Sequence, residues 1–302
     1  MANVALAAPS SAWHARTMHV GIMFANTGRG ASPTGAAALA QLAESVGIES
    51  LWAVEHVVVP AGYESKYPYD PSGKMAGGAE EFDLPDPLVW LTFVAAHTSR
   101  VKLATGILIV PQRNPVILAK EVATLDHLSG GRMLLGVGVG WLEEEFAALG
   151  VPFAERGARL DEYIQALRAL WTQDKATMHG RFVDFADCIS RPRPANGTVP
   201  ILVGGHTPAA ARRAGRLGDG FFPGNADASE IAALTAVVRT TAVEAGRDPD
   251  AIEVSAMVGG KGDALLRRVE ALAGAGVTRV IVPALRDDAI VAAYEAITTR
   301  FR

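Results

Sequence analysis

The sequence is poor in cysteine, in excess positive charge and in long apolar runs, and each shortage excludes a class of protein. A single cysteine, Cys188, cannot form an intrachain disulfide, and no Cys/His spacing resembles a zinc site. A reducing cytoplasm therefore suits the chain best. The net charge of -4 disfavours nucleic-acid and anionic-membrane partners, because both need clustered positive charge. No stretch reaches the roughly 18 uninterrupted apolar residues of a membrane helix. We therefore expect small-molecule chemistry.

Apolar residues are abundant enough for a large core. Hydrophobic residues make up 49% and charged residues 20% of the 302 residues, close to the globular average. Residues 1–17 contain Ala-rich patches broken by Pro9, Ser10 and Ser11, so we expect a disordered extension there and not a signal peptide. Residues 18–302 are predicted to form one domain, a length that α/β barrels routinely reach.

From Met18 onward, short apolar runs alternate with longer amphipathic stretches, which is typical of repeated βα units around a parallel sheet. The predicted strands are His19–Phe24, Ser50–Val54, Val101–Ile109, Arg132–Val137, Val199–Val203, Asp219–Phe222, Ile252–Met257 and Arg279–Val282. The predicted helices are Gly35–Val46, Asp86–Thr98, Pro115–Leu128, Arg156–Trp171, Pro208–Leu217, Ser229–Ala245, Ala264–Ala273 and Asp288–Thr299. Eight strands, each with its helix, predict an α/β fold of the (β/α)8 TIM-barrel type.

Two connections are too long for barrel turns and are predicted to be insertions. One follows strand two, over residues 57–84, and is rich in Gly, Pro and Tyr. The other precedes strand five, over residues 172–198, and contains MHGRFVDFADC, whose alternation predicts a hairpin. Barrel active sites lie at the C-terminal ends of the strands. The segment after strand two is therefore a candidate lid.

Glycines mark the end of the fourth predicted strand. The run RMLLGVGVGWLEEEF carries Gly136, Gly138 and Gly140 on alternate residues, so one face of the strand end lacks side chains. A flat or phosphorylated ligand could lie directly against the backbone there. Close backbone packing in a crowded core is the alternative.

A second glycine signal ends the fifth predicted strand, in VPILVGGHTPAAARRAG. Gly204 and Gly205 precede Thr207, a predicted N-cap, and Pro208, the first predicted helical residue. Free backbone N–H groups and the helix dipole favour an anion at such a place, and phosphate is the obvious one. An ordinary capped helix after a tight turn is the alternative. Two glycine rims together favour a phosphorylated cofactor.

Polar groups follow strands two and three. Glu55 and His56 stand where strand two meets the long segment, and they could bind substrate or exchange a proton; a structural hydrogen-bonded pair is the alternative. Because adjacent strand residues point to opposite faces, we expect His56, with Trp52 and Val54, to face the pocket. After strand three, Arg113 is either an anion contact or an unspecific surface residue.

Acidic and aromatic residues follow the first glycine rim. Consecutive glutamates at Glu143, Glu144 and Glu145 cannot converge on one metal ion from a helix, so we expect them to stabilise a helix N-terminus, and no metal site is predicted. Trp52 and Trp141 could stack on a ring or fill the core. We place Trp141 on the pocket wall, because it directly follows the glycines.

Three motifs in this order carry a family resemblance: SLWAVEHVVVP, PVILAKEVATLDHLSGGRMLLGVGVGW and PILVGGHTPAAARRAGRLGDGFFP. Over roughly residues 18–285 the chain resembles the bacterial luciferase-like superfamily, specifically its coenzyme F-420-dependent oxidoreductases. The family fold is an eight-stranded barrel, in agreement with the strand count. The resemblance implies hydride transfer to or from a deazaflavin ring or, in flavin-using relatives, oxygen chemistry on reduced FMN.

The resemblance also assigns residues. It implies a non-prolyl cis peptide bond between Gly106 and Ile107, set against the back of the ring and bowing it. His56 matches the family position beside the reactive ring face, where it would donate or accept a proton, with Glu55 beside it. The implied cofactor cradle consists of Gly138, Val139, Gly140, Gly204, Gly205, His206 and Thr207.

One departure bears on the substrate. In the sugar-phosphate dehydrogenase branch an acid follows the last glycine of the rim, whereas Trp141 stands there in this chain. An apolar or aromatic substrate suits Trp52, Trp141 and the tyrosines of the long segment better; these are Tyr63, Tyr67 and Tyr69. Arg113 is predicted to line the same substrate pocket.

We therefore expect a cytoplasmic F-420-dependent oxidoreductase acting on a small organic substrate. The alternatives are an FMN-dependent monooxygenase served by a partner reductase, and a non-catalytic flavin-binding homologue. The resemblance further implies a homodimer, while neither a nucleic-acid nor a membrane partner is expected.

Overall fold

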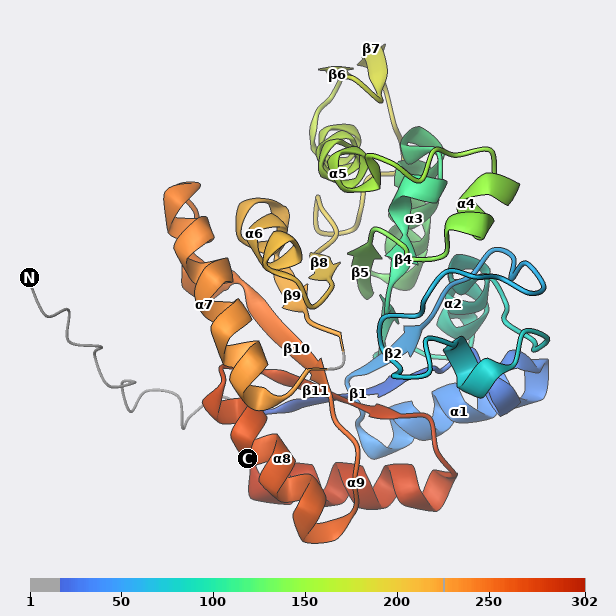
Figure 1. Ribbon diagram of the computed structural model, residues 1–302, viewed down its shortest axis with the longest axis vertical. Coiled ribbons are helices and arrows are strands. Elements are labelled where there is room, and N and C mark those ends of the chain that lie inside the picture. The colour runs from blue at the N-terminus through green and yellow to red at the C-terminus, as the bar shows by residue number, and fades with distance from the viewer. Residues whose placement is uncertain (1–16, 225, 302) are drawn as a thin grey trace, which may run out of the picture.

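Eight parallel strands close into a barrel surrounded by helices in the computed structural model, which describes residues 17–224 and 226–301 (Figure 1). The predicted TIM-barrel class is confirmed. The eight barrel strands comprise nine elements, because β3 and β4 are two halves of one strand. The elements are β1 (His19–Met23), β2 (Ser50–Ala53), β3 (Lys102–Thr105), β4 (Leu108–Ile109), β5 (Met133–Gly138), β8 (Ile201–Gly204), β9 (Gly220–Phe222), β10 (Glu253–Met257) and β11 (Arg279–Pro283). The order around the sheet is β3-β2-β1-β11-β10-β9-β8-β5-β4, and the pairing of β3 with β5 closes it.

The third barrel strand differs from its prediction because it is interrupted. Residues 101–109 were expected to form one strand, but β3 ends at Thr105 and β4 begins at Leu108. The peptide bond between Gly106 and Ile107 in this gap is cis, as the family resemblance implies. Both halves pair with β5, so they remain parts of one barrel strand.

The helices begin and end close to their predicted bounds because local capping signals fix them. Side chains of Ser32, Asp86, Asn114, Thr207 and Asp227 accept hydrogen bonds from backbone N–H groups in the first turn of their helices. The helices are α1 (Pro33–Val46), α2 (Pro87–Ala96), α3 (Pro115–Ser129), α4 (Glu143–Ala148), α5 (Arg156–Thr172), α6 (Pro208–Leu217), α7 (Ala228–Glu244), α8 (Gly262–Gly274) and α9 (Asp287–Arg300). Short 3-10 helices are η2 (Gly28–Ala31), η3 (Met75–Gly78), η4 (Val110–Gln112) and η5 (Pro249–Ala251).

An apolar cluster inside the barrel includes one side chain from each of the eight barrel strands. These are Met23, Trp52, Ala104, Leu134, Leu202, Phe222, Met257 and Ile281. Trp52 is the largest of them, is 0% exposed and lies 5.1 Å from the Phe222 ring between centroids. Trp52 was expected to line a substrate pocket. It instead forms part of the packed layer, while Val54 faces the same interior as predicted.

Two glycines make room for the Trp52 indole. A β-carbon at Gly21 would lie 2.7 Å from Trp52 Nε1, and one at Gly106 would lie 3.1 Å from Trp52 Cε3 and 2.9 Å from Met23 Cε. Any larger residue at either position would collide with this layer. The side chains of Met23 and Trp52 therefore require a glycine at position 106.

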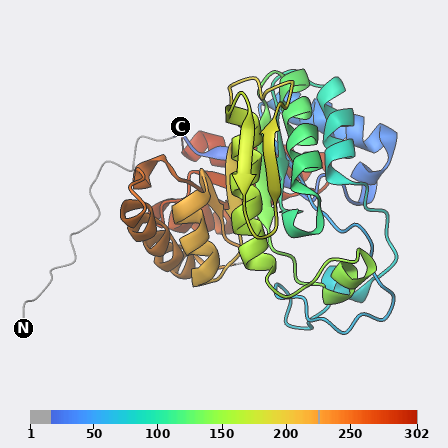
Figure 2. The ribbon, with the colours of Figure 1, turned by 90° about the horizontal axis from the view of Figure 1, so that it is seen from above.

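Two segments lie outside the regular βα repeat. Residues 57–84, between β2 and α2, run beside α4, as Figures 1 and 2 both show. The predicted hairpin is present as β6 (Ala176–His179) and β7 (Asp184–Cys188), which pair antiparallel and lie along α5 (Figure 2). The predicted disordered extension, residues 1–17, lies outside the described residues except for Thr17. None of the described helices is long and apolar enough to cross a membrane.

An ion-pair network closes the N-terminal end of the barrel. Arg279, which is 1% exposed, donates to the Glu49 carboxylate from Nε at 2.8 Å and also pairs with Glu253. Lys102 Nζ lies 3.0 Å from Glu49 as well. Burial raises the pKa of Glu49, but the hydrogen bonds and charges of Arg279 and Lys102 outweigh it and lower that pKa to about 2.

Replacing Glu49 by Gln should remove a pH-dependent part of the free energy of unfolding. Because the folded-state pKa is lowered, the contribution of Glu49 is present above its ordinary pKa and is lost as the pH falls from about 4.5 to about 2. Urea unfolding should show Glu49→Gln less stable at pH 7, by on the order of 3 kcal/mol, with the deficit shrinking through this window. A deficit that stays constant from pH 7 to pH 2 would contradict this assignment.

Candidate active site

The candidate residues gather at the C-terminal ends of the barrel strands. His56 follows β2, Gly138 ends β5 and Gly204 ends β8. Residues 57–84 cross this end, because Tyr69 packs on His206 after β8, with 5.1 Å between ring centroids. A β-carbon at Gly224, after β9, would lie 2.1 Å from Tyr69 Cε1. The long segment thus reaches from the end of β2 to the ends of β8 and β9.

The two glycine rims face the side chain of Ile107. A β-carbon at Gly138 would lie 2.3 Å from Ile107 Cδ1, and one at Gly204 would lie 2.6 Å from Ile107 Cγ2. Gly138 and Gly204 are on the inner faces of their strands, above Leu134 and Leu202. Gly138 is thus tightly packed, which is the alternative given for the first rim, and Gly204 is tightly packed as well, which was not anticipated. Ile107 forms an apolar platform on top of the interior layer.

His56 is held by a buried carboxylate from α4. The side chain of His56 is 8% exposed, and its Nδ1 lies 3.0 Å from Oε2 of Glu145, which is 0% exposed. An ionised carboxylate only accepts hydrogen bonds, so Nδ1 carries the hydrogen. Burial raises the pKa of Glu145, but the hydrogen bonds from His56, the amide of Gln112 and the Val57 N–H outweigh it and keep that pKa lowered. The described residues offer Nε2 no hydrogen-bond partner, which leaves this atom available for a ligand.

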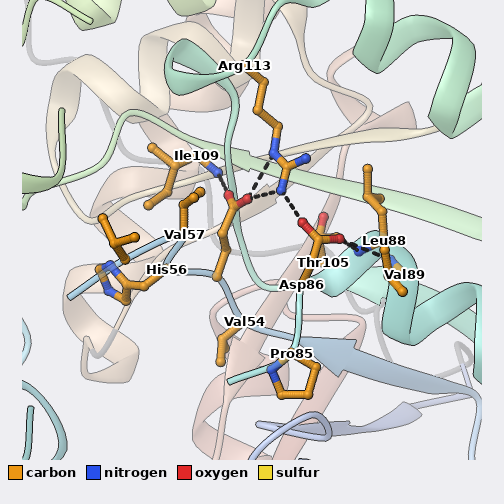
Figure 3. A network of polar contacts seen from close by, with 12 residues as sticks. Val54, His56, Val57, Pro85, Asp86, Leu88, Val89, Thr105, Ile109 and Arg113 are labelled. Atoms are coloured by element: carbon orange, nitrogen blue, oxygen red, sulfur yellow. Dashed lines mark hydrogen bonds and ion pairs between the residues drawn. The ribbon is translucent and has the colours of Figure 1, made fainter. Parts of the chain in front are cut away.

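Glu55 points away from His56 and serves a different network. Its carboxylate accepts hydrogen bonds from Arg113 Nε at 2.9 Å, from Arg113 Nη2 and from the Ile109 backbone N–H. Arg113 also reaches Asp86 at 2.6 Å, and Figure 3 shows these two residues facing one another while His56 is turned away. Burial raises the pKa of the Glu55 carboxyl, against the lowering effect of Arg113.

This network bears on two predictions. Arg113 is already engaged by two carboxylates, which speaks against its predicted role as an anion contact. Glu55 is 5% exposed and fixes the backbone of β4, so it supports the strand that carries Ile107. Both carboxylate oxygens of Glu55 are engaged, whereas Nε2 of His56 has no partner among the described residues. Of the two, only His56 is therefore available for chemistry.

An aromatic cluster centred on Trp141 lies beside His56. Trp141 lies edge-on to His56, Tyr63 and Tyr67, at 5.6, 5.5 and 5.2 Å between ring centroids. Tyr67 in turn contacts Tyr69, at 5.3 Å. Trp141 thus connects the end of the first glycine rim with the long segment. The place of Trp141 on the pocket wall stays a prediction.

Two residues near His56 were not anticipated as site residues. Glu145 was expected to stabilise a helix N-terminus, but its buried carboxylate binds His56 and the backbone of Val57. No local pattern identifies this partner, because the two residues are 89 positions apart. Gln112, 9% exposed, lies beside Glu145, and neither of its amide atoms has a hydrogen-bond partner of good geometry. A buried amide in this state is suited to a polar ligand atom or a water.

The second rim leads into an exposed helix N-terminus. Thr207 caps α6 by accepting from Ala210 N–H at 3.2 Å, and Pro208 is the first helical residue, as predicted. Gly205 has φ of 124°, a conformation that L side chains rarely adopt, and His206 and Thr207 are exposed. The donors of this turn therefore face solvent, where an anionic group can reach them. Among the described residues no group of three or more His, Cys, Asp or Glu could hold a metal ion.

Comparison with known proteins gives a family match over most of the chain. The family model described as luciferase-like monooxygenase matches residues 18–260. An uncharacterized protein of Mycobacterium tuberculosis is 40% identical over 187 residues, which cover 62% of this chain and 65% of the relative. The chain thus spans less than two thirds of that relative's length.

Two further similarities involve proteins whose names include coenzyme F-420. The F-420-dependent glucose-6-phosphate dehydrogenase of Kineococcus radiotolerans is 36% identical over 184 residues, which cover 60% of this chain and 49% of the dehydrogenase. Among solved structures, an F-420-dependent secondary alcohol dehydrogenase in complex with an F-420-acetone adduct covers 93% of this chain and 98% of its own, with a TM-score of 0.78 and 19% identity. At this identity the structural likeness shows the fold alone.

Replacing Gly138 by Ala should destabilise the protein through Ile107. The new methyl group must displace Ile107 Cδ1 or the strand, and such overpacking costs about 1–3 kcal/mol. Gly274→Ala is the matched control, since nothing lies within 4 Å of a β-carbon there. Thermal unfolding should show a clear loss for Gly138→Ala, a negligible one for Gly274→Ala, and a smaller loss for Gly138→Ala in an Ile107→Ala background. Equal losses with and without Ile107 would contradict the packing explanation.

Proposed function

The chain belongs to the luciferase-like monooxygenase family, and from this premise we propose that it is an oxidoreductase dependent on coenzyme F-420. It would move a hydride between this deazaflavin and a small apolar or aromatic organic substrate. The observation that carries the proposal is the arrangement of Ile107, His56 and the N-terminus of α6 around one barrel mouth. The family relatives whose names include F-420 support the choice of cofactor.

The residues present fit such a cofactor. Ile107, seated on Gly138 and Gly204, offers an apolar surface for a flat ring, and the exposed turn at His206 and Thr207 offers donors for its phosphate. Coenzyme F-420, when bound, supplies the hydride donor or acceptor at its ring. The remaining task of the protein is to position the substrate, exclude water and move the accompanying proton.

His56 is the group that we assign to the proton. With Nδ1 committed to Glu145, the lone pair of Nε2 can accept a proton from the substrate, or Nε2 can return one in the reverse direction. Residues 57–84 exclude water from this atom by placing Tyr63 and Tyr67 around Trp141. Glu55 and Arg113 act further back, by holding the strand of Ile107 in place.

The side chains around His56 favour an apolar or aromatic substrate over a sugar phosphate. Three aromatic rings surround Trp141, which stands where the sugar-phosphate branch carries an acid. Three cations near these rings are engaged, Arg113 by Glu55 and Asp86, Lys74 by the Tyr63 carbonyl and ring, and Arg156 by the carbonyls of Gly140 and Phe153. A phosphate on the substrate would therefore find no free positive charge among these residues.

An assembly and a location complete the proposal. We expect a homodimer, and two exposed apolar residues on adjacent helices support it: Val89 of α2 is 70% exposed and Ile117 of α3 is 59% exposed. A cytoplasmic location remains the expectation from the single cysteine.

Titration with F-420 and with FMN should separate the proposed cofactor from its alternative. We expect the fluorescence of F-420 to change on binding with a Kd in the micromolar range or below, and the response to FMN to be at least about tenfold weaker. Tight FMN binding with no F-420 response would favour the FMN-dependent monooxygenase, which needs a partner reductase. Binding of F-420 with no turnover across a broad substrate panel would favour the non-catalytic homologue.

His56→Asn should lower turnover without abolishing cofactor binding. Loss of a general acid or base typically costs about 10²–10⁴-fold in rate, whereas the platform for the ring remains. The measurement is the absorbance change of F-420 with a substrate found in a panel of apolar and aromatic alcohols, aldehydes and ketones. His97→Asn is the control, since His97 is exposed at the C-terminal end of α2 and contacts Phe93. Normal turnover of His56→Asn would remove His56 from the mechanism.

A further inference from the structure

Two glutamates of the acidic helix α4 accept hydrogen bonds from backbone N–H groups of residues 57–84. Glu145 Oε1 accepts from the N–H groups of Val57 at 2.6 Å and Val58 at 3.4 Å. Glu144 Oε1 accepts from Glu64 N–H at 2.7 Å and from Ser65 N–H at 3.0 Å. Two neighbouring carboxylates thus hold two separate parts of residues 57–84, and Figures 1 and 2 show the segment lying along this helix.

The residues that flank the segment are fixed by other side chains, whereas α4 holds the first part of the segment itself. Asn26 binds Val54 through both its amide atoms, at 2.8 and 2.9 Å, and also donates to the Pro85 carbonyl at 3.0 Å. Arg113 joins Glu55 to Asp86 in the same region. The two flanks of the segment are therefore held together at its base, while residues 57, 58, 64 and 65 are bound by Glu144 and Glu145.

Glu145 differs from Glu144 because its two oxygens have different partners. Oε1 holds the long segment, whereas Oε2 accepts from Nδ1 of His56. The whole side chain is 0% exposed, so water cannot replace either partner. His56 directly precedes Val57, so the two contacts act on adjacent residues of one backbone.

We propose that Glu145 is a positioning residue that sets the tautomer of His56, with the hydrogen on Nδ1 and the lone pair on Nε2, while Glu144 holds the segment without acting on His56. This inference rests on the proposed role of His56 in proton transfer. Glu145 touches neither substrate nor cofactor in this scheme, and it acts through the imidazole ring. One buried carboxylate thereby links the docked position of residues 57–84 to the state of the proton-transfer group.

The test compares three glutamine variants of the full chain without cofactor or substrate. Glu145→Gln removes the charge that selects the tautomer, and Glu144→Gln weakens only the binding of the segment. Glu143→Gln is the matched control, because the Glu143 side chain is exposed and contacts neither His56 nor the segment, to which Glu143 is joined only by its backbone N–H. Ring nitrogen shifts from NMR report the tautomer, with the His56 signals among the seven histidines assigned by His56→Asn. Limited trypsin digestion at Lys66 and Lys74 reports release of the segment.

We expect the wild type and Glu143→Gln to show the hydrogen of His56 on Nδ1, and Glu145→Gln to show it on Nε2 or divided between both nitrogens. Digestion should be about tenfold faster for both Glu144→Gln and Glu145→Gln than for Glu143→Gln, since a charged acceptor becomes neutral. Glu144→Gln should keep the wild-type tautomer.

Two results would overturn the proposal. An unchanged tautomer in Glu145→Gln would remove Glu145 as the selecting group, and an equal change in Glu144→Gln would mean that docking alone sets the tautomer. Should Glu145→Gln not fold, the wild-type spectrum still decides, because a hydrogen on Nε2 there contradicts the scheme. These readouts need no F-420, so a failure of the proposed cofactor would leave them intact and is detected separately by titration.

Discussion

The filling of the barrel interior is the constraint on which the rest of the structure depends. Eight parallel strands close only if side chains occupy the space between them, and each strand contributes one residue to this layer. Trp52 is so large that Gly21 and Gly106 must lack side chains opposite it. The interior therefore has no room for a ligand at this level, and chemistry is confined to the loops above it. The interruption of the third strand begins at the same Gly106.

The site is built directly on this layer. Ile107 lies above it, in space that Gly138 and Gly204 leave free, so the two glycine rims and the break in the third strand form one packed unit. His56 lies at the end of the strand that carries Trp52, and Glu145 fixes its orientation from α4. The same helix holds residues 57–84, which bring their aromatic side chains to Trp141. Packing and the proposed roles in proton transfer and water exclusion thus depend on neighbouring parts of the chain.

Local signals in the sequence predict much of this and fail where partners are distant. Periodicity and capping residues such as Thr207 and Asn114 locate the strands and helices closely, because these signals act within one turn. Glycine spacing locates the barrel mouth, but it cannot reveal that Ile107 fills the space. The pairing of His56 with Glu145, and of Arg113 with Glu55, depends on how strands and loops meet in three dimensions. Trp52 shows the same limit, since inward alternation does not distinguish a packed layer from a pocket wall.

The central claim is that Ile107 supports a deazaflavin ring with His56 beside its reactive face. A crystal structure of the protein with coenzyme F-420 tests it most directly. The ring should lie against Ile107, with its phosphate at the turn formed by His206 and Thr207 and with His56 Nε2 facing the reactive side of the ring. A ring bound elsewhere on the barrel, or one that displaces Ile107 from Gly138 and Gly204, would contradict the claim.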